Sequence, residues 1–147
     1  MKIRLILASL VCTAAVITGL QAQPKEKEPK TPLAEKMEAI DGAQRAMNRA
    51  LTAGNAEEAL KQATIIHDAA EASAKLEPKN ANLVPAESRA KFVADYQADM
   101  KAFVEHTQKL VAALKAGNVE EAKTINETLK KAKTDGHKSY KAAPKKA

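Results

Sequence analysis

The chain has 147 residues, of which 45% are hydrophobic, 31 are alanine and only four are aromatic, and its formal net charge is +6. Alanine favours helices, whereas strands favour β-branched and aromatic residues, so the composition argues against an all-β sandwich or barrel. The five glycines form no dinucleotide-binding or P-loop motif, and the single cysteine, Cys12, excludes an intrachain disulfide and a C-x-x-C zinc or haem-attachment site.

Residues 1–22 are typical of a secretory signal peptide. Two basic residues precede an apolar stretch over residues 5–20, and Ala22 is a small residue before a polar start. Val11 is too large to precede a lipidated Cys12, and the stretch is shorter than the roughly 20 residues of a membrane anchor. We therefore expect cleavage and export to the periplasm, without stable membrane association afterwards.

Two charged segments flank the region that we expect to fold. Residues 23–30 alternate charges between two prolines and predict a flexible leader, and residues 142–147 predict a flexible basic tail. Signal cleavage removes two basic residues and lowers the net charge from +6 to +4, which is too small to predict nucleic-acid binding. Residues 31–141 remain as one predicted domain.

The first predicted helix has Thr31 as its N-cap and Pro32 in its first turn, and it ends near Gly54. The second begins at Asn55, with Glu58 placed to complete a capping box, and runs to about residue 76. Prolines at positions 78 and 85 bracket the loop that follows. The apolar stripe of the first helix consists of Leu33, Met37, Ile40, Gln44, Met47 and Leu51.

The third predicted helix ends at Gly117, and the fourth starts at Asn118 with Glu121 in the position that Glu58 has in the second. Both helices carry one stripe at helical spacing. The stripe of the third helix is Phe92, Tyr96, Met100, Phe103, Leu110 and Leu114. The stripe of the fourth is Ala122, Ile125, Leu129, Ala132, Gly136, His137 and Tyr140.

The two short junctions are nearly identical in sequence. Residues 51–59 read LTAGNAEEA and residues 114–122 read LKAGNVEEA, at an offset of 63 positions. The stripes repeat at the same offset, which indicates two duplicated helical hairpins. Short junctions make consecutive helices antiparallel, so we predict an all-α, up-down-up-down four-helix bundle with its long loop between the second and third helices.

In such a bundle the start of the first helix and the end of the fourth lie together. At 1.5 Å per residue, Met37 and His137 are expected within about one turn of the same level. A thioether and an imidazole that face each other are the two axial ligands of a low-spin haem. Each residue also has an ordinary interpretation, since methionines pack in cores and histidines complement helix C-termini.

Two segments carry a resemblance to a known family. Residues 33–40 (LAEKMEAI) resemble the opening L-x-x-x-M-E-x-[LI] of the soluble cytochrome b562 family, and residues 119–141 are similar to its last helix without a gap, including an H-x-x-Y-[KR] ending. The resemblance covers residues 31–141. It implies one non-covalent haem b per chain, with Met37 and His137 as axial ligands of the iron.

The related c′-type bundles attach haem through C-x-x-C-H, whereas residues 133–137 here read KTDGH, which excludes covalent attachment. The family commonly has an arginine and an aromatic residue at the positions of Lys133 and Gly136. Lys133 is expected to meet a haem propionate as a point charge. Gly136 either leaves room for the porphyrin edge or marks a loosened, haem-free relative.

The sequence has further candidate residues at the same end of the bundle and elsewhere. Tyr96 and Met100 are candidate contacts of the porphyrin, with core packing as the alternative. His67 and His106 lie beside the stripes and are interpreted as surface or boundary residues. No Glu-x-x-His pair supports a di-iron site, and no Ser/His/Asp arrangement supports hydrolysis.

The leading hypothesis is therefore a monomeric periplasmic electron carrier, not an enzyme and without catalytic residues, whose partners are haem and an unidentified redox protein. The alternative is a haem-free periplasmic bundle that acts as an adaptor or chaperone-like binding protein. The two differ in whether Met37 and His137 matter for function.

Overall fold

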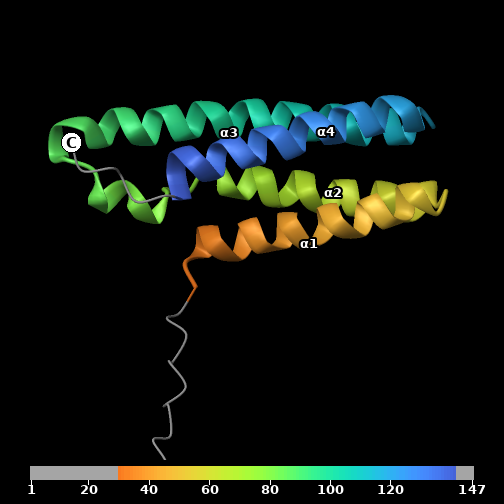
Figure 1. Ribbon diagram of the computed structural model, residues 1–147, viewed down its shortest axis with the longest axis horizontal. Coiled ribbons are helices and arrows are strands. Elements are labelled where there is room, and N and C mark those ends of the chain that lie inside the picture. Colours follow the sequence, from red (N-terminus) through yellow and green to blue (C-terminus); the bar gives the residue numbers. More distant parts are fainter. Residues whose placement is uncertain (1–29, 142–147) are drawn as a thin grey trace, which may run out of the picture.

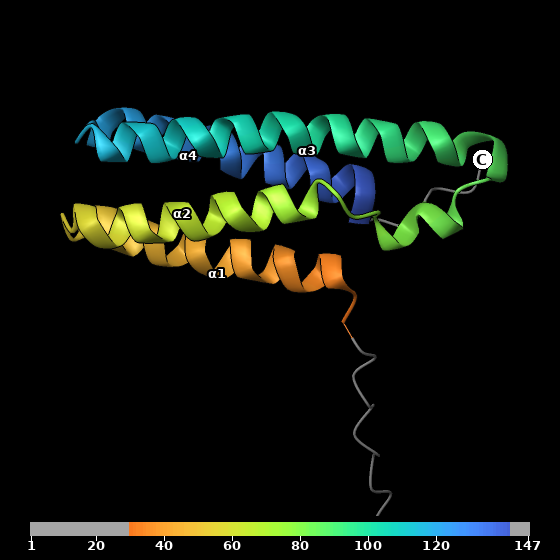
Figure 2. The ribbon, with the colours of Figure 1, turned by 180° about the vertical axis from the view of Figure 1, so that it is seen from behind.

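The computed structural model describes residues 30–141, which form four antiparallel α-helices: α1 (Pro32–Thr52), α2 (Ala56–Ser73), α3 (Ala86–Lys115) and α4 (Val119–Gly136). Figures 1 and 2 show the up-down-up-down arrangement, with the start of α1 and the end of α4 at one end of the bundle. The predicted bundle is confirmed. The predicted signal peptide, almost all of the leader and the tail lie outside the described residues.

The predicted starts of the first two helices are confirmed by side-chain caps. The Thr31 hydroxyl accepts a hydrogen bond from the Ala34 N–H at 3.2 Å, and the Asn55 side chain accepts one from the Glu58 N–H at 3.0 Å. The reciprocal half of the capping box is not formed, because the Asn55 N–H donates to the Ala50 carbonyl, and the Glu58 carboxylate accepts a hydrogen bond from Gln62.

The two short junctions have the same backbone geometry. Gly54 and Gly117 have φ values of 71° and 77°, in the left-handed region where a side chain is strained. At each junction the N–H of the following asparagine donates to a carbonyl in the last helical turn at 2.9 Å, from Asn55 to Ala50 and from Asn118 to Ala113. The sequence duplication is therefore also a structural one.

These glycines allow a matched stability test. Gly117→Ala is expected to lower the free energy of unfolding by about 1 to 2 kcal/mol, because alanine disfavours the left-handed conformation. Gly42→Ala is expected to raise it by about 1 kcal/mol, because Gly42 lies inside α1 with open space around its Cα. Urea denaturation of both variants measures the two signs. A destabilising Gly42→Ala or a neutral Gly117→Ala would contradict this description of the junctions.

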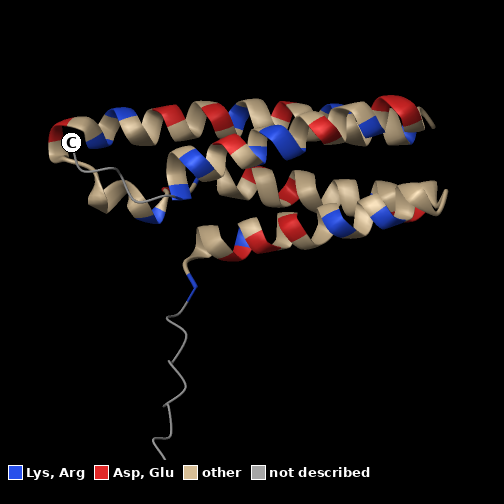
Figure 3. Ribbon diagram, in the orientation of Figure 1, with Lys and Arg blue, Asp and Glu red and all other residues tan. Residues whose placement is uncertain are grey.

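The core is built from the predicted stripes. Ile40 and Met47 of α1 and Phe103 and Leu110 of α3 occupy equivalent buried positions in the two hairpins. Fully buried alanines on α2 and α4 keep the neighbouring helices close to the core, namely Ala59, Ala63, Ala70 and Ala122. Figure 3 shows acidic and basic residues interspersed along α1, α3 and α4.

The ends of two helices differ from the prediction. The α2 helix stops at Ser73, where the hydroxyl bonds back to the Ala69 carbonyl, and the following loop contains a short 3₁₀ helix, η1 (Lys79–Leu83). The last turn, η2 (His137–Lys141), is π-helical rather than α-helical. Within residues 30–141, no helix is both long and apolar enough to cross a membrane.

Candidate functional site

A cavity of about 830 Å³ lies at the end of the bundle where α1 begins and α4 ends. Its walls come from α1, α3, the boundary between α4 and η2, and the loop that contains η1. Leu33, Ile40 and Phe103 contribute apolar surface, whereas several exposed residues of the lining are charged. The volume lies within the range of about 300 to 1,000 Å³ that is typical of small-molecule and cofactor sites.

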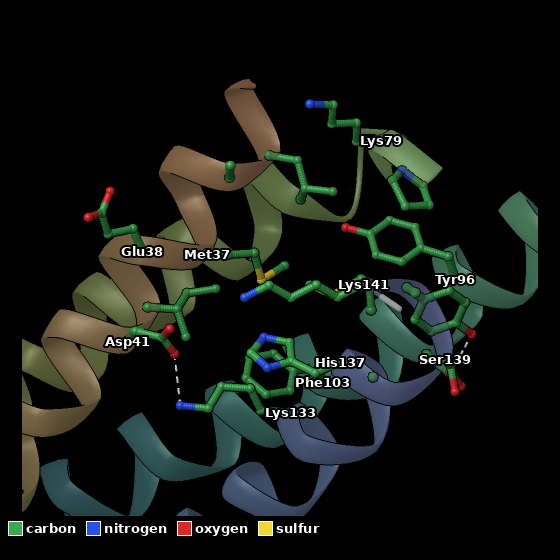
Figure 4. A pocket seen from close by; sticks show the side chains of 18 of the residues that line it. Met37, Glu38, Asp41, Lys79, Tyr96, Phe103, Lys133, His137, Ser139 and Lys141 are labelled. Atoms are coloured by element: carbon green, nitrogen blue, oxygen red, sulfur yellow. Dashed lines mark hydrogen bonds and ion pairs between the residues drawn. The ribbon is translucent and has the colours of Figure 1, made fainter. Parts of the chain in front are cut away.

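Met37 and His137 both line this cavity. Each is partly buried, and Figure 4 shows the Met37 thioether and the His137 ring pointing into the same space from α1 and from the start of η2. The change from α-helix to π-helix occurs at His137, and π-helical turns are frequent at functional sites. The cavity therefore has a soft sulfur donor and an imidazole donor among its walls.

A chain of polar side chains joins α1 to α4 beside the cavity, and we call it the α1–α4 seam. The Lys133 ammonium lies 2.8 Å from an Asp41 carboxylate oxygen and 2.6 Å from the Gln44 side-chain oxygen. The Gln44 amide donates to Asn126 at 3.1 Å, and the Asn126 amide donates to Asn48 at 2.6 Å. The seam thus consists of Asp41, Gln44 and Asn48 on α1, and Asn126 and Lys133 on α4.

The seam aligns the two candidate ligands. Asp41 and Asn48 lie four and eleven residues after Met37 on α1. Their partners on α4, Lys133 and Asn126, lie four and eleven residues before His137. Four and eleven residues are close to one and three turns, so these side chains share a helix face with the ligand candidates. Equal offsets in antiparallel helices place Met37 and His137 at the same level along the bundle.

The three other predicted site residues also line the cavity, with different surroundings. Met100 and Tyr96 are buried on α3, and the Tyr96 hydroxyl donates to the Ser73 carbonyl at 3.1 Å. The Lys133 ammonium is bound to Asp41 within the seam, whereas the sequence predicts that it meets a haem propionate as a point charge.

Two cations of the lining were not singled out by the sequence. Arg45 on α1 and Lys141 at the end of η2 are both exposed, and the side-chain cation of neither has a hydrogen bond or ion pair with another described residue. Figure 4 shows the Lys141 side chain extending into the cavity. The basic residue in the H-x-x-Y-[KR] ending was the available sequence signal for Lys141.

Tyr140 closes one wall of the cavity. Its ring makes edge contacts with Phe92 and Tyr96, at centroid distances of 5.4 and 5.2 Å, and its hydroxyl donates to the Asp99 carboxylate at 2.6 Å. Burial, followed by the hydrogen bond to Asp99, raises the pKa of Tyr140 above its ordinary value. The Asn80 amide donates to the carbonyls of residues 140 and 141 and ties η1 to this wall.

Gly136 ends α4 at the edge of the cavity. A Cβ built on it would meet no atom within 4 Å, so the space beside it is open. Open space at this position agrees with both expectations for Gly136, room for a porphyrin edge and a loosened relative. Gly136 has no left-handed φ, so an alanine there would not strain the backbone.

The remaining histidines lie outside the cavity lining. His67 Nδ1 is 3.0 Å from the buried Thr107 hydroxyl oxygen, and its Nε2 is 3.7 Å from Glu71, while His106 is partly exposed on α3. Their interpretation as boundary residues is confirmed. Among residues 30–141, no group of three or more histidine, cysteine, aspartate or glutamate side chains is arranged to hold a metal ion.

Titration of the buried Tyr96 hydroxyl is expected to make the stability of the fold depend on pH in the alkaline range. Burial raises the pKa of Tyr96 to about 12, whereas an unfolded tyrosine titrates near pH 10. The unfolded chain therefore releases the Tyr96 proton at lower pH than the folded protein does. The contribution of this hydroxyl to the free energy of unfolding is fully present below about pH 10 and declines by about 2 kcal/mol as the pH rises to 12.

The matched variant is Tyr96→Phe, which loses the bond to Ser73 and this titration together. We expect it to be about 1 kcal/mol less stable at pH 8 and to show a shallower loss of stability above pH 10. Denaturation series at pH 8, 10 and 11.5 measure both effects. Parallel pH profiles for the two proteins would contradict the prediction.

Comparison with known proteins identifies a family. The family model described as "Cytochrome b562" matches residues 32–141, which is three-quarters of the chain and covers all four helices and all of the cavity lining except residues 30 and 31. Neither the search of curated proteins nor the search of solved structures gave a match.

Proposed function

The chain belongs to the cytochrome b562 family, and we propose that it is a periplasmic electron carrier that binds one non-covalent haem b through Met37 and His137. The observation that carries this proposal is the α1–α4 seam, because its pairs align Met37 on α1 with His137 at the end of α4. Both side chains line one cavity, which is large enough for a cofactor.

The donor set fits the group. An imidazole and a thioether together are an axial pair of low-spin haem iron, and this pair raises the reduction potential. When bound, haem supplies reversible one-electron chemistry, and the protein provides the ligands, the orientation and the low-polarity surroundings. Apolar side chains of α1 and α3 exclude water from the cavity walls, among them Ile40, Met100 and Phe103.

The carboxylates of a haem would meet cations at the cavity mouth. Arg45 and Lys141 support this assignment better than Lys133, because the cationic group of neither is bound by another described side chain. Lys133 is held by Asp41 and Gln44, so it contributes charge near the site from within the wall.

We propose a carrier rather than an enzyme, because both axial positions would be filled by side chains and a ligand would have to leave before substrate could bind iron. Residues 1–22 support export to the periplasm, since they have the pattern of a cleaved signal peptide. A separate redox protein would be the electron-transfer partner of the monomer. The alternative function is a haem-free adaptor or chaperone-like bundle, which the open space beside Gly136 also permits.

Addition of haem to the purified protein tests the proposal. We expect stoichiometric uptake of one haem per chain and sharp low-spin absorption bands after reduction. Met37→Leu, which conserves the side-chain volume, is expected to fold and to give a high-spin spectrum. The haem-free alternative predicts no saturable uptake, and no difference between the wild-type protein and Met37→Leu.

A further inference from the structure

The geometry points to a role for the α1–α4 seam. Its residues are positioning residues that hold Met37 in register with His137. This inference rests on the proposed function, since it concerns how the two ligands are kept opposite each other. The seam residues are assigned no contact with haem in this role.

The seam is buried at its centre and fully connected. Gln44 is 4% exposed and Asn126 is 2% exposed, and each makes hydrogen bonds on both sides of its amide group. Within residues 30–141, no buried side-chain nitrogen or oxygen lacks a hydrogen-bond partner. The polar atoms of the seam therefore satisfy one another across the helix boundary.

Such a network fixes the alignment of two helices. Buried amides lose their hydrogen bonds to water, and they replace them only when their partners on the other helix lie opposite them. Apolar stripes tolerate a small slide, since one alkyl contact replaces another. A slide of α1 past α4 by one turn, in either direction, would cost the buried Asn126 amide one of its two partners on α1 and would separate Asp41 from Lys133. Buried polar residues fix helix register in coiled coils for the same reason.

The boundary between α1 and α4 depends on such a polar network more than the other helix boundaries do. The backbones of α1 and α2, of α2 and α3, and of α3 and α4 pack closely, and a single connection joins each pair, whereas α1 and α4 pack less closely and no loop joins them. Between α1 and α4, the hydrogen bonds and ion pairs found in the described part of the chain are those of the seam.

A volume-conserving double variant tests the inference. Gln44→Leu together with Asn126→Leu removes the amides and fills the same space, and Gln97→Leu together with Gln108→Leu makes the equivalent change at exposed sites on α3. We expect the seam variant to remain folded but to release haem at least tenfold faster and to give a mixture of high-spin and low-spin spectra. The α3 control is expected to match the wild-type protein.

A charge swap supplies a rescue test. Asp41→Lys places two ammonium groups together and is expected to speed haem release, whereas Asp41→Lys combined with Lys133→Asp restores the pair and the wild-type rate. If the seam only stabilised the fold, the rate of haem release would follow thermal stability in all variants. Failure of the swapped pair to restore the low-spin spectrum would count against the inference.

A measurement without haem separates this inference from the proposed function. Spin labels at Ala39→Cys on α1 and Thr134→Cys on α4, in a Cys12→Ser background, report the separation of the helices. We expect a narrow distance distribution that broadens in the seam double variant and not in the α3 control. If haem uptake fails while the distance distribution still broadens in the seam double variant, only the proposed function is overturned. An unchanged distribution and an unchanged rate of haem release overturn the inference about the seam.

Discussion

Replacement of His137 by alanine is expected to weaken haem binding by about 100-fold or more and to convert the low-spin spectrum to a high-spin one. Loss of a residue that merely orients a metal ligand costs 10-fold to 100-fold in affinity, so loss of the ligand itself costs at least the larger value. Haem titration followed by absorbance measures the affinity and the spin state together.

His106→Ala is the matched control, because His106 is a partly exposed histidine on α3 outside the cavity lining. It is expected to retain the affinity and spectrum of the wild-type protein. Added imidazole should restore the low-spin spectrum of His137→Ala, since the cavity of about 830 Å³ retains the space left by the ring. An unaltered spectrum in His137→Ala would remove His137 from the ligand set.

Leu110→Ala is expected to have the largest effect on stability, with a loss of about 2 to 5 kcal/mol in the free energy of unfolding. Leu110 is fully buried on α3, and Met47 is its equivalent on α1 in the duplicated hairpin. A cavity left at either position is lined by close-packed side chains that cannot collapse fully. Met47→Ala is therefore expected to cost a similar amount.

Leu83→Ala serves as the control, because Leu83 is 60% exposed in η1 and its truncation is expected to cost within about 0.5 kcal/mol. Chemical denaturation of the three variants gives the comparison. A loss below 1 kcal/mol for Leu110→Ala would show that the inner faces of α1 and α3 are packed less tightly than the structure describes.

The bundle could be predicted from the sequence because its signals are local. The repeated Gly-Asn junctions require a left-handed glycine and an antiparallel return, whatever the rest of the chain does. The shared end for Met37 and His137 then follows from counting turns along helices of known rise. These predictions needed no knowledge of side-chain contacts.

The α1–α4 seam could not be predicted in the same way. Asp41 and Asn48 lie beside the apolar stripe and look like members of a solvated face, while Asn126 lies between Ile125 of the stripe and Glu127 on α4. Their partners are 78 to 92 residues away in sequence, so the bonds exist only once two separate helices are aligned.

The π-helical turn η2 cannot be predicted from the sequence for a related reason. Residues 137–141 continue the helical spacing of α4, and nothing in their sequence departs from it. The carbonyls of Tyr140 and Lys141 instead accept hydrogen bonds from Asn80 in the distant η1 segment. Long-range bonding of this kind can change the last turn of a helix without leaving a local signal.

The most direct test of the central claim is proton NMR of the reduced, haem-loaded protein with labelled methionine methyl groups. The chain has four methionines, and both Met37 and Met100 line the cavity. We predict that one methyl resonance shifts far upfield under the porphyrin ring current and that it is lost in Met37→Leu. A shifted resonance that survives in Met37→Leu and is lost in Met100→Leu, or the absence of any such resonance, would contradict ligation by Met37.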